Sequence, residues 1–130
     1  MERNLMISVH RPPHGSIYVQ EAIEVMFIFA SYDINLSVVF MDDGVMALKS
    51  GQDGSEAGMK GFMASLGALV DFEVENVFVD EESLKERNIS VDDLVSIGDD
   101  FDTDVPVYPK VVSSAEIREM MDKQQGILPF

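Results

Sequence analysis

The chain has 130 residues, of which 24 are acidic, 9 are basic and none is cysteine, so its formal net charge is −15. A surface this negative repels phosphate backbones and argues against direct nucleic-acid binding, while the missing thiols exclude disulfides, thiolate metal sites and cysteine nucleophiles. The longest apolar run, Val25 to Ala30, is far shorter than the ~20 residues that cross a bilayer, and the first residues lack a signal-peptide core, so we expect a cytoplasmic protein without membrane contact.

The chain begins with the pattern of a strand followed by a helix. Leu5 to Val9 is a short apolar run, and the prolines after His10 prevent a ladder or a helix from continuing. Ser16 can cap a helix with one apolar face. That face consists of Val19, Ile23, Met26, Phe27 and Ala30.

The second half of this helix carries more apolar residues than one core-facing side needs. Val25, Ile28 and Phe29 fill the opposite side. A helix that is apolar nearly all round must be covered on both sides. Because little chain remains to form an extra layer, we expect another subunit to cover it.

The run from Leu36 to Met41 is continuously apolar, as in a strand buried on both faces of a parallel sheet. It ends in Asp42-Asp43-Gly44, where glycine would supply a positive φ and an aspartate would cap the short helical turn Val45 to Leu48. This turn leads to a loop that includes Gly51 and Gln52.

A second amphipathic helix, a strand and a third helix follow. The apolar face of the second helix is Met59, Phe62, Met63, Leu66, Leu69 and Val70. Val74 to Val79 predicts a strand, and Asp80 is placed to cap the charged helix Glu81 to Arg87.

The segment from Ile89 to Pro109 is acidic and gives little periodicity. We expect one weak strand near Leu94 to Ile97 and a solvated acidic loop that faces a basic partner. The series Asp100-x-Asp102-x-Asp104 imitates a calcium loop, but Val105 stands where that loop requires glycine, so we reject an EF-hand.

The last segment predicts a helix and a strand. Ser113 and Glu116 form a capping box that opens a helix through Ile117, Met120 and Met121. This helix stops by Gly126, and Ile127 to Phe130 adds a final strand. Repeated strand-helix alternation without a linker indicates one domain over residues 1–130, with the three-layer α/β/α architecture.

Two loops could carry a site. His10, His14 and Gly15 follow the first strand, at the edge where open α/β sheets bind ligands. The acidic turn Asp42-Asp43-Gly44 follows the second strand, and its paired carboxylates could bind a cation or a partner. Ordinary turn chemistry explains both loops as well, and we favour it.

We therefore expect no cofactor and no metal site. There is no phosphate-binding glycine pattern, no third metal ligand near the histidines, and no activated nucleophile. Composition and residue spacing, taken by themselves, indicate an acidic α/β protein with a subunit interface.

Several short motifs follow one another in the chain: Pro13-His14-Gly15, Glu21-Ala22, Val39 to Val45, Gly51-Gln52, Val79, and Ser83 to Arg87. Their order and spacing resemble the DsrE/DsrF/DsrH family of sulfur-relay proteins, which includes TusB, TusC and TusD of tRNA thiolation, and they resemble the DsrF/TusC branch most.

This resemblance implies a mainly parallel five-stranded sheet and a heterohexamer with DsrE-like and DsrH-like subunits. It also implies that Asp80 stands where the family has its sulfur-carrying cysteine. Only a thiolate attacks a sulfane sulfur and carries it as a persulfide. The chain is then expected to be a non-transferring subunit in sulfur oxidation that shapes a docking face for a DsrC/TusE-like carrier.

Three alternatives stay open. One is a TusC-like role in the sulfur relay for tRNA 2-thiouridine. Another is a homo-oligomeric relative that binds a small ligand. The third is a free-standing enzyme or binding protein that uses His14, Gly15, Asp42 and Asp43 at the sheet edge.

Overall fold

A computed structural model describes residues 3–13, 17–32, 34–50 and 64–130. Five strands form one parallel sheet in the order β6-β3-β2-β1-β7. These strands are β1 (Arg3–Val9), β2 (Ile34–Phe40), β3 (Val77–Asp80), β6 (Lys110–Val112) and β7 (Gly126–Pro129). The parallel five-stranded sheet expected from the family resemblance is confirmed.

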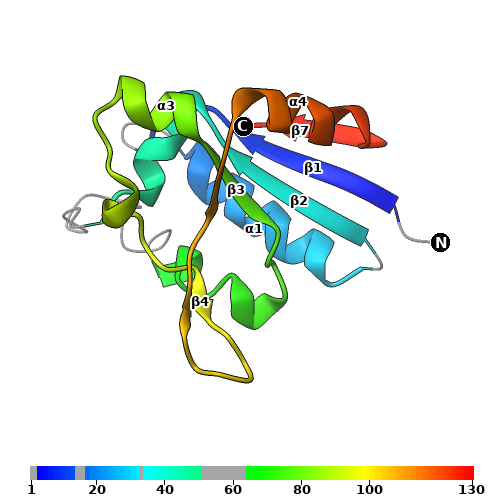
Figure 1. The fold of residues 1–130 in the computed structure, drawn as a ribbon. Coiled ribbons are helices and arrows are strands. Elements are labelled where there is room, and N and C mark those ends of the chain that lie inside the picture. Colours follow the sequence, from blue (N-terminus) through cyan, green and yellow to red (C-terminus); the bar gives the residue numbers. More distant parts are fainter. Residues whose placement is uncertain (1–2, 14–16, 33, 51–63) are drawn as a thin grey trace.

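Helices cover both faces of the sheet (Figure 1). Consecutive strand residues point to opposite faces, so Ile7 packs into the larger core under α1 (Tyr18–Ala30), whereas Met6 packs with Ile117 of α4 (Ser114–Asp122). The predicted α/β/α layering is therefore confirmed. The α4 side has the smaller core.

Two short helices lie at the edge of the sheet where the strands end, and two more lie in the connections. The 3-10 helix η1 (Asp42–Leu48) follows β2, and α3 (Glu81–Glu86) follows β3 directly. The 3-10 helices η2 (Val70–Phe72) and η3 (Val91–Asp93) lie in the connections on either side of β3 and α3. No helix in the described part of the chain is long and apolar enough to span a membrane.

The first helix begins with Tyr18, and Ile17 occupies its N-cap without a side-chain hydrogen bond. The predicted cap, Ser16, lies outside the described residues. The chain itself covers most of the surplus apolar side of this helix, because Val25 and Phe29 are half-buried against the main core. Ile28 remains exposed.

Residues 51–63 lie outside the described residues, and they contain the predicted loop with Gly51 and Gln52 and the first part of the predicted second helix, from Met59. Its described end is helical only at residues 64–66, and Val70 instead starts η2. The next strand is shorter than predicted. Val74 is buried, but its N–H donates to the carbonyl of Leu69 rather than to a strand.

The strand predicted at Leu94 to Ile97 is wrong. Leu94 makes only an isolated antiparallel bridge with Lys49, and β4 (Gly98–Asp99) and β5 (Pro106–Val107) form a small separate hairpin. The sheet strand that the sequence did not reveal is β6, which is three residues long. A short, half-buried edge strand has too few residues to show a period.

Candidate functional site

The carboxyl ends of four strands lie level with one another, and polar side chains from these ends meet there. The register pairs Val9 with Phe40, Phe40 with Val79, and Asp80 with Val112. Residues that directly follow β1, β2 and β6 are therefore brought beside Asp80 at the end of β3. Parallel α/β sheets commonly bind ligands at this edge.

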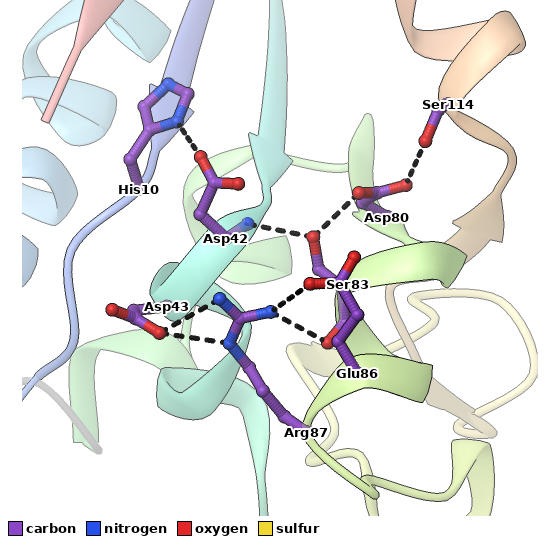
Figure 2. A network of polar contacts seen from close by, with 8 residues as sticks. All are labelled: His10, Asp42, Asp43, Asp80, Ser83, Glu86, Arg87 and Ser114. Atoms are coloured by element: carbon purple, nitrogen blue, oxygen red, sulfur yellow. Dashed lines mark hydrogen bonds and ion pairs between the residues drawn. The ribbon is translucent and has the colours of Figure 1, made fainter.

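Asp80 lies at the centre of this network and is 6% exposed. Its carboxylate accepts a hydrogen bond from the hydroxyl of Ser83 at 2.7 Å and another from the hydroxyl of Ser114 at 3.0 Å. Figure 2 shows Asp80 between these two hydroxyl groups, one from α3 and one from α4. The carboxylate therefore fastens both helices to the end of β3.

Asp80 was predicted to cap α3, and it does occupy the N-cap position. Its side chain makes no capping hydrogen bond, however. The prediction is wrong in this respect, because the two hydroxyl donors use the carboxylate instead. Ser114 reaches it only through the β6-α4 connection, which is distant in sequence.

The acidic turn after β2 joins the same network. The backbone N–H of Asp42 donates to the Ser83 hydroxyl at 2.9 Å, and the Asp42 carboxylate lies 2.8 Å from Nδ1 of His10. The other ring nitrogen of His10 lies 2.9 Å from the hydroxyl of Ser8. A chain of polar contacts thus runs from β1 to α4 (Figure 2).

Asp42 itself has a left-handed backbone, with φ of 51°. This conformation is uncommon outside glycine, although aspartate tolerates it better than most residues. The prediction that Gly44 supplies the positive φ is wrong. The structure also shows no side-chain cap on η1, whose N-cap is Met41.

Gly44 is required for a different reason. A Cβ at this position would lie 2.0 Å from the carbonyl oxygen of Val9. The turn therefore passes directly against the end of β1, and only a residue without a side chain fits. This close approach holds Asp42 within reach of His10.

Asp43 points to another helix. One of its carboxylate oxygens lies 3.0 Å from both Nε and Nη2 of Arg87, and Nη1 of Arg87 donates to the Ser83 carbonyl at 3.1 Å. This ion pair fastens η1 to the end of α3. Asp43 is half exposed, so the pair adds little stability.

A hollow of about 390 Å³ opens between the strand ends, α3 and α4. Its lining includes several carboxylates, and apolar side chains from α4 and from the residue that follows β2. The lining residues are Met41, Asp42, Asp80, Glu82, Ser83, Glu86, Ser114, Ile117, Arg118 and Met121. Such a surface suits an apolar or cationic segment of a partner more than an anion.

The structure brings together only part of the predicted site. Asp42, Asp43 and Gly44 lie at the strand ends with Asp80, whereas His14 and Gly15 lie outside the described residues. Sequence reasoning missed the roles of Ser83 and Ser114. A sequence signal for Ser83 was its position three residues after Asp80, which places it in the first turn of α3, on the same side as the N-cap residue Asp80.

The hydroxyl groups of Ser83 and Ser114 are not free nucleophiles in this arrangement. Both donate to a carboxylate, and among the described residues neither forms a hydrogen bond with a histidine that could act as a base. In the described part of the chain, no three His, Asp or Glu side chains gather closely enough to hold a metal ion. The polar contacts hold η1, α3 and α4 at the ends of the strands, and the hollow lies beside them.

The chain is similar to known proteins along nearly its whole length. The model of the DsrE/DsrF-like family matches residues 3–130. The intracellular sulfur oxidation protein DsrF of Allochromatium vinosum is 37% identical, over 98% of this chain and 96% of that protein. A TusC homolog of Vibrio parahaemolyticus is 34% identical over 91% of each chain.

Solved structures show the same fold at low identity. The ychN protein of E. coli superposes with a TM-score of 0.70 at 16% identity, and the match covers 100% of both chains. The protein MTH1491 of Methanobacterium thermoautotrophicum gives a TM-score of 0.58, also at 16% identity, over 98% of this chain and 100% of that one. The resemblance to the DsrF/TusC branch is confirmed by the sequence relatives.

Proposed function

The chain belongs to the DsrE/DsrF-like family, and from that premise we propose that it is a non-catalytic subunit of a DsrEFH-type sulfurtransferase complex in intracellular sulfur oxidation. The relative named for sulfur oxidation supports the pathway, because it is 37% identical along nearly the whole chain. The expected partners are DsrE-like and DsrH-like subunits. Together they would form a heterohexamer.

The observation that carries the proposal is the missing thiol. Sulfur relay requires a thiolate that attacks the sulfane sulfur of a donor, displaces the donor thiolate and holds the sulfur as a persulfide. The 130 residues contain no cysteine. Neither carboxylates nor hydroxyl groups perform this step, so the contribution of the chain is architectural.

We further propose that Asp80, the last residue of the third strand of the chain, occupies the position of the family's sulfur-carrying cysteine. The surroundings of Asp80 support a structural role at this position. Its carboxylate is buried and fastens α3 and α4 through two hydroxyl groups. In this subunit the edge would shape a docking face for a cysteine-bearing carrier similar to DsrC/TusE.

Exposed apolar side chains around the second half of α1 support an assembly. Ile28 and Tyr32 lie one helical turn apart and are exposed, and Phe72 is exposed beside Phe27, with 4.4 Å between the two ring centroids. Exposed large apolar residues at the end of α1 and on η2, which contact each other through Phe27 and Phe72, favour a protein contact.

Native mass spectrometry of the chain with its co-expressed homologous subunits tests this role. We expect a heterohexamer, and we expect Ile28→Asp to prevent its assembly because a buried unpaired charge is costly. Val91→Asp is a matched control, since Val91 is 58% exposed and Ile28 is 54% exposed. A well-folded chain that ignores both homologues would overturn the proposal.

Sulfur transfer is tested separately. The chain alone should not turn over thiosulfate or a persulfide donor. Asp80→Cys should gain a persulfide when a donor is offered, detected by mass spectrometry after alkylation, whereas Ser90→Cys on an exposed turn should gain less. Failure of Asp80→Cys to gain sulfur would show that Asp80 does not occupy the sulfur-bearing position.

A TusC-like role is the second candidate, and the 34% identity to a TusC homolog favours it. Deleting the chain from its organism would then lower the 2-thiouridine content of tRNA without changing sulfur oxidation. We expect instead that the deletion impairs sulfur oxidation and leaves the 2-thiouridine content of tRNA unchanged. A homo-oligomeric relative would instead assemble in the same mass spectrometry experiment without either homologue.

A further inference from the structure

A second surface lies away from the sheet edge, on the small hairpin formed by β4 and β5. We call residues 98–107 the acidic hairpin. Figure 1 shows it extending below the main sheet, in yellow and orange. Phe101 is 64% exposed at its turn, and Val105 beside β5 and Tyr108 just beyond it are also exposed.

The acidic hairpin is held in a defined shape. The Asp100 carboxylate accepts hydrogen bonds from the backbone N–H groups of Asp102 and Thr103, at 2.9 and 3.1 Å, and the Asp100 N–H donates to the Val105 carbonyl at 2.9 Å. These donors stabilise the ionised carboxylate and lower the pKa of Asp100. The exposed Phe101 is therefore presented on an ordered turn.

The base of the hairpin is fixed to the body of the molecule. Gly98 has φ of 136°, and a Cβ there would lie 2.7 Å from the Cβ of Val70. The N–H of Val70 donates to the carbonyl of Ile97, and the N–H of Ile97 donates to the carbonyl of Val107. A fixed element loses less conformational entropy on binding than a flexible one.

The charge of this region has one sign. No lysine or arginine occurs between Arg87 and Lys110, whereas six aspartates do, four of them within residues 99–104. The carboxylates of Asp99, Asp102 and Asp104 surround an exposed phenyl ring in sequence. An apolar group surrounded by one sign of charge selects a partner with the opposite sign.

We propose that the acidic hairpin is a docking element for a different protein, whose surface presents an apolar recess rimmed by lysine or arginine. Phe101 would enter the recess, and the aspartates would pair with the rim. A second copy of this chain is disfavoured as the occupant because both copies carry the net charge of −15. Ten residues make a small interface, of the size seen in transient complexes.

Photo-cross-linking in the cells that make the full chain tests the proposal. An amino acid that carries a benzophenone replaces Phe101, and a control chain carries it in place of Leu128, which is 42% exposed on the edge strand β7. We expect the Phe101 probe to label another protein at a peptide rich in lysine or arginine. Labelling only copies of this chain, a surface without basic residues, or nothing beyond the control pattern would overturn the proposal.

The partner found in this way is then purified and its affinity for the full chain is measured at two salt concentrations. Phe101→Ser should weaken binding by about 10-fold to 100-fold, as loss of a buried aromatic anchor does. The double variant Asp102→Asn with Asp104→Asn should slow association and flatten its salt dependence, while Asp100 is kept because it holds the turn. Unchanged affinity in both variants would refute the proposal.

These results are independent of subunit assembly. Phe101→Ser should leave the thermal unfolding temperature of the chain unchanged, because the ring is exposed. The proposed sulfurtransferase complex could fail to form and the cross-link could still appear, so the two proposals fail separately.

Discussion

Gly44→Ala should destabilise the protein severely, although it adds only one methyl group. The new Cβ would lie 2.0 Å from the carbonyl oxygen and 2.6 Å from the carbonyl carbon of Val9. Real Cβ atoms essentially never approach other atoms within 3.0 Å, so η1 and β1 would have to separate by about 1 Å. Both groups in contact are backbone, and neither can rotate away.

The separation would also strain the hydrogen bond from the Met41 N–H to the Val9 carbonyl, which is 2.9 Å long. Overpacking of a rigid site typically costs about 1–3 kcal/mol, and a buried hydrogen bond adds about 1 kcal/mol. We therefore expect Gly44→Ala to lower the free energy of unfolding by about 3 kcal/mol. For a chain of this length the midpoint of thermal unfolding should fall by about 10 °C.

Urea unfolding followed by circular dichroism measures this loss. Gly126→Ala is the matched control, because its Cβ would meet only the flexible end of Leu5, at 3.1 Å. Gly44 does not have a positive φ, so alanine adds no backbone strain there and the effect isolates the collision. Equal stability of Gly44→Ala and the parent protein would refute the close approach of η1 to β1.

Three further changes test the polar network and the acidic hairpin. Asp80→Ala should lower the free energy of unfolding by about 1–3 kcal/mol because two hydroxyl groups lose their acceptor, and a loss below about 0.5 kcal/mol in urea unfolding would contradict this. A double-mutant cycle of Arg87→Met and Asp43→Asn should give a coupling energy of about 0.5–1 kcal/mol, since Asp43 is half exposed, and a coupling well above this would show a pair more buried than observed. The pKa of Asp100, measured by NMR, should lie below its ordinary value of 3.8 because backbone N–H groups bind the carboxylate. The stabilisation from Asp100 is therefore present above pH 3.8 and is lost as the pH falls through the lowered pKa, and Asp100→Asn should remove that pH dependence.

Much of the fold followed from local patterns in the chain. The apolar run in β2, the periodic face of α1, and the capping of α4 all predicted their elements. In α4, the Ser113 hydroxyl accepts the N–H of Glu116, as the capping box predicted. These elements depend on neighbours within a few residues, which is why sequence reasoning found them.

The site was less predictable. The sequence predicts Asp42 in a turn and Asp80 as a helix cap, with no link between them, yet the structure joins them through Ser83. The role of Gly44 was misjudged, since its need arises from Val9, which is distant along the chain. Strand β6 was missed because three residues show no period.

By itself, the sequence determined the alternation of strands and helices, the strong negative charge, and the absence of any thiol that could carry sulfur. Only the tertiary structure decided that the strand ends lie level and that one buried carboxylate fastens two helices. The physical reason is range: helix periodicity and capping act within a few residues, whereas strand register and backbone collisions depend on segments that meet only when the chain folds.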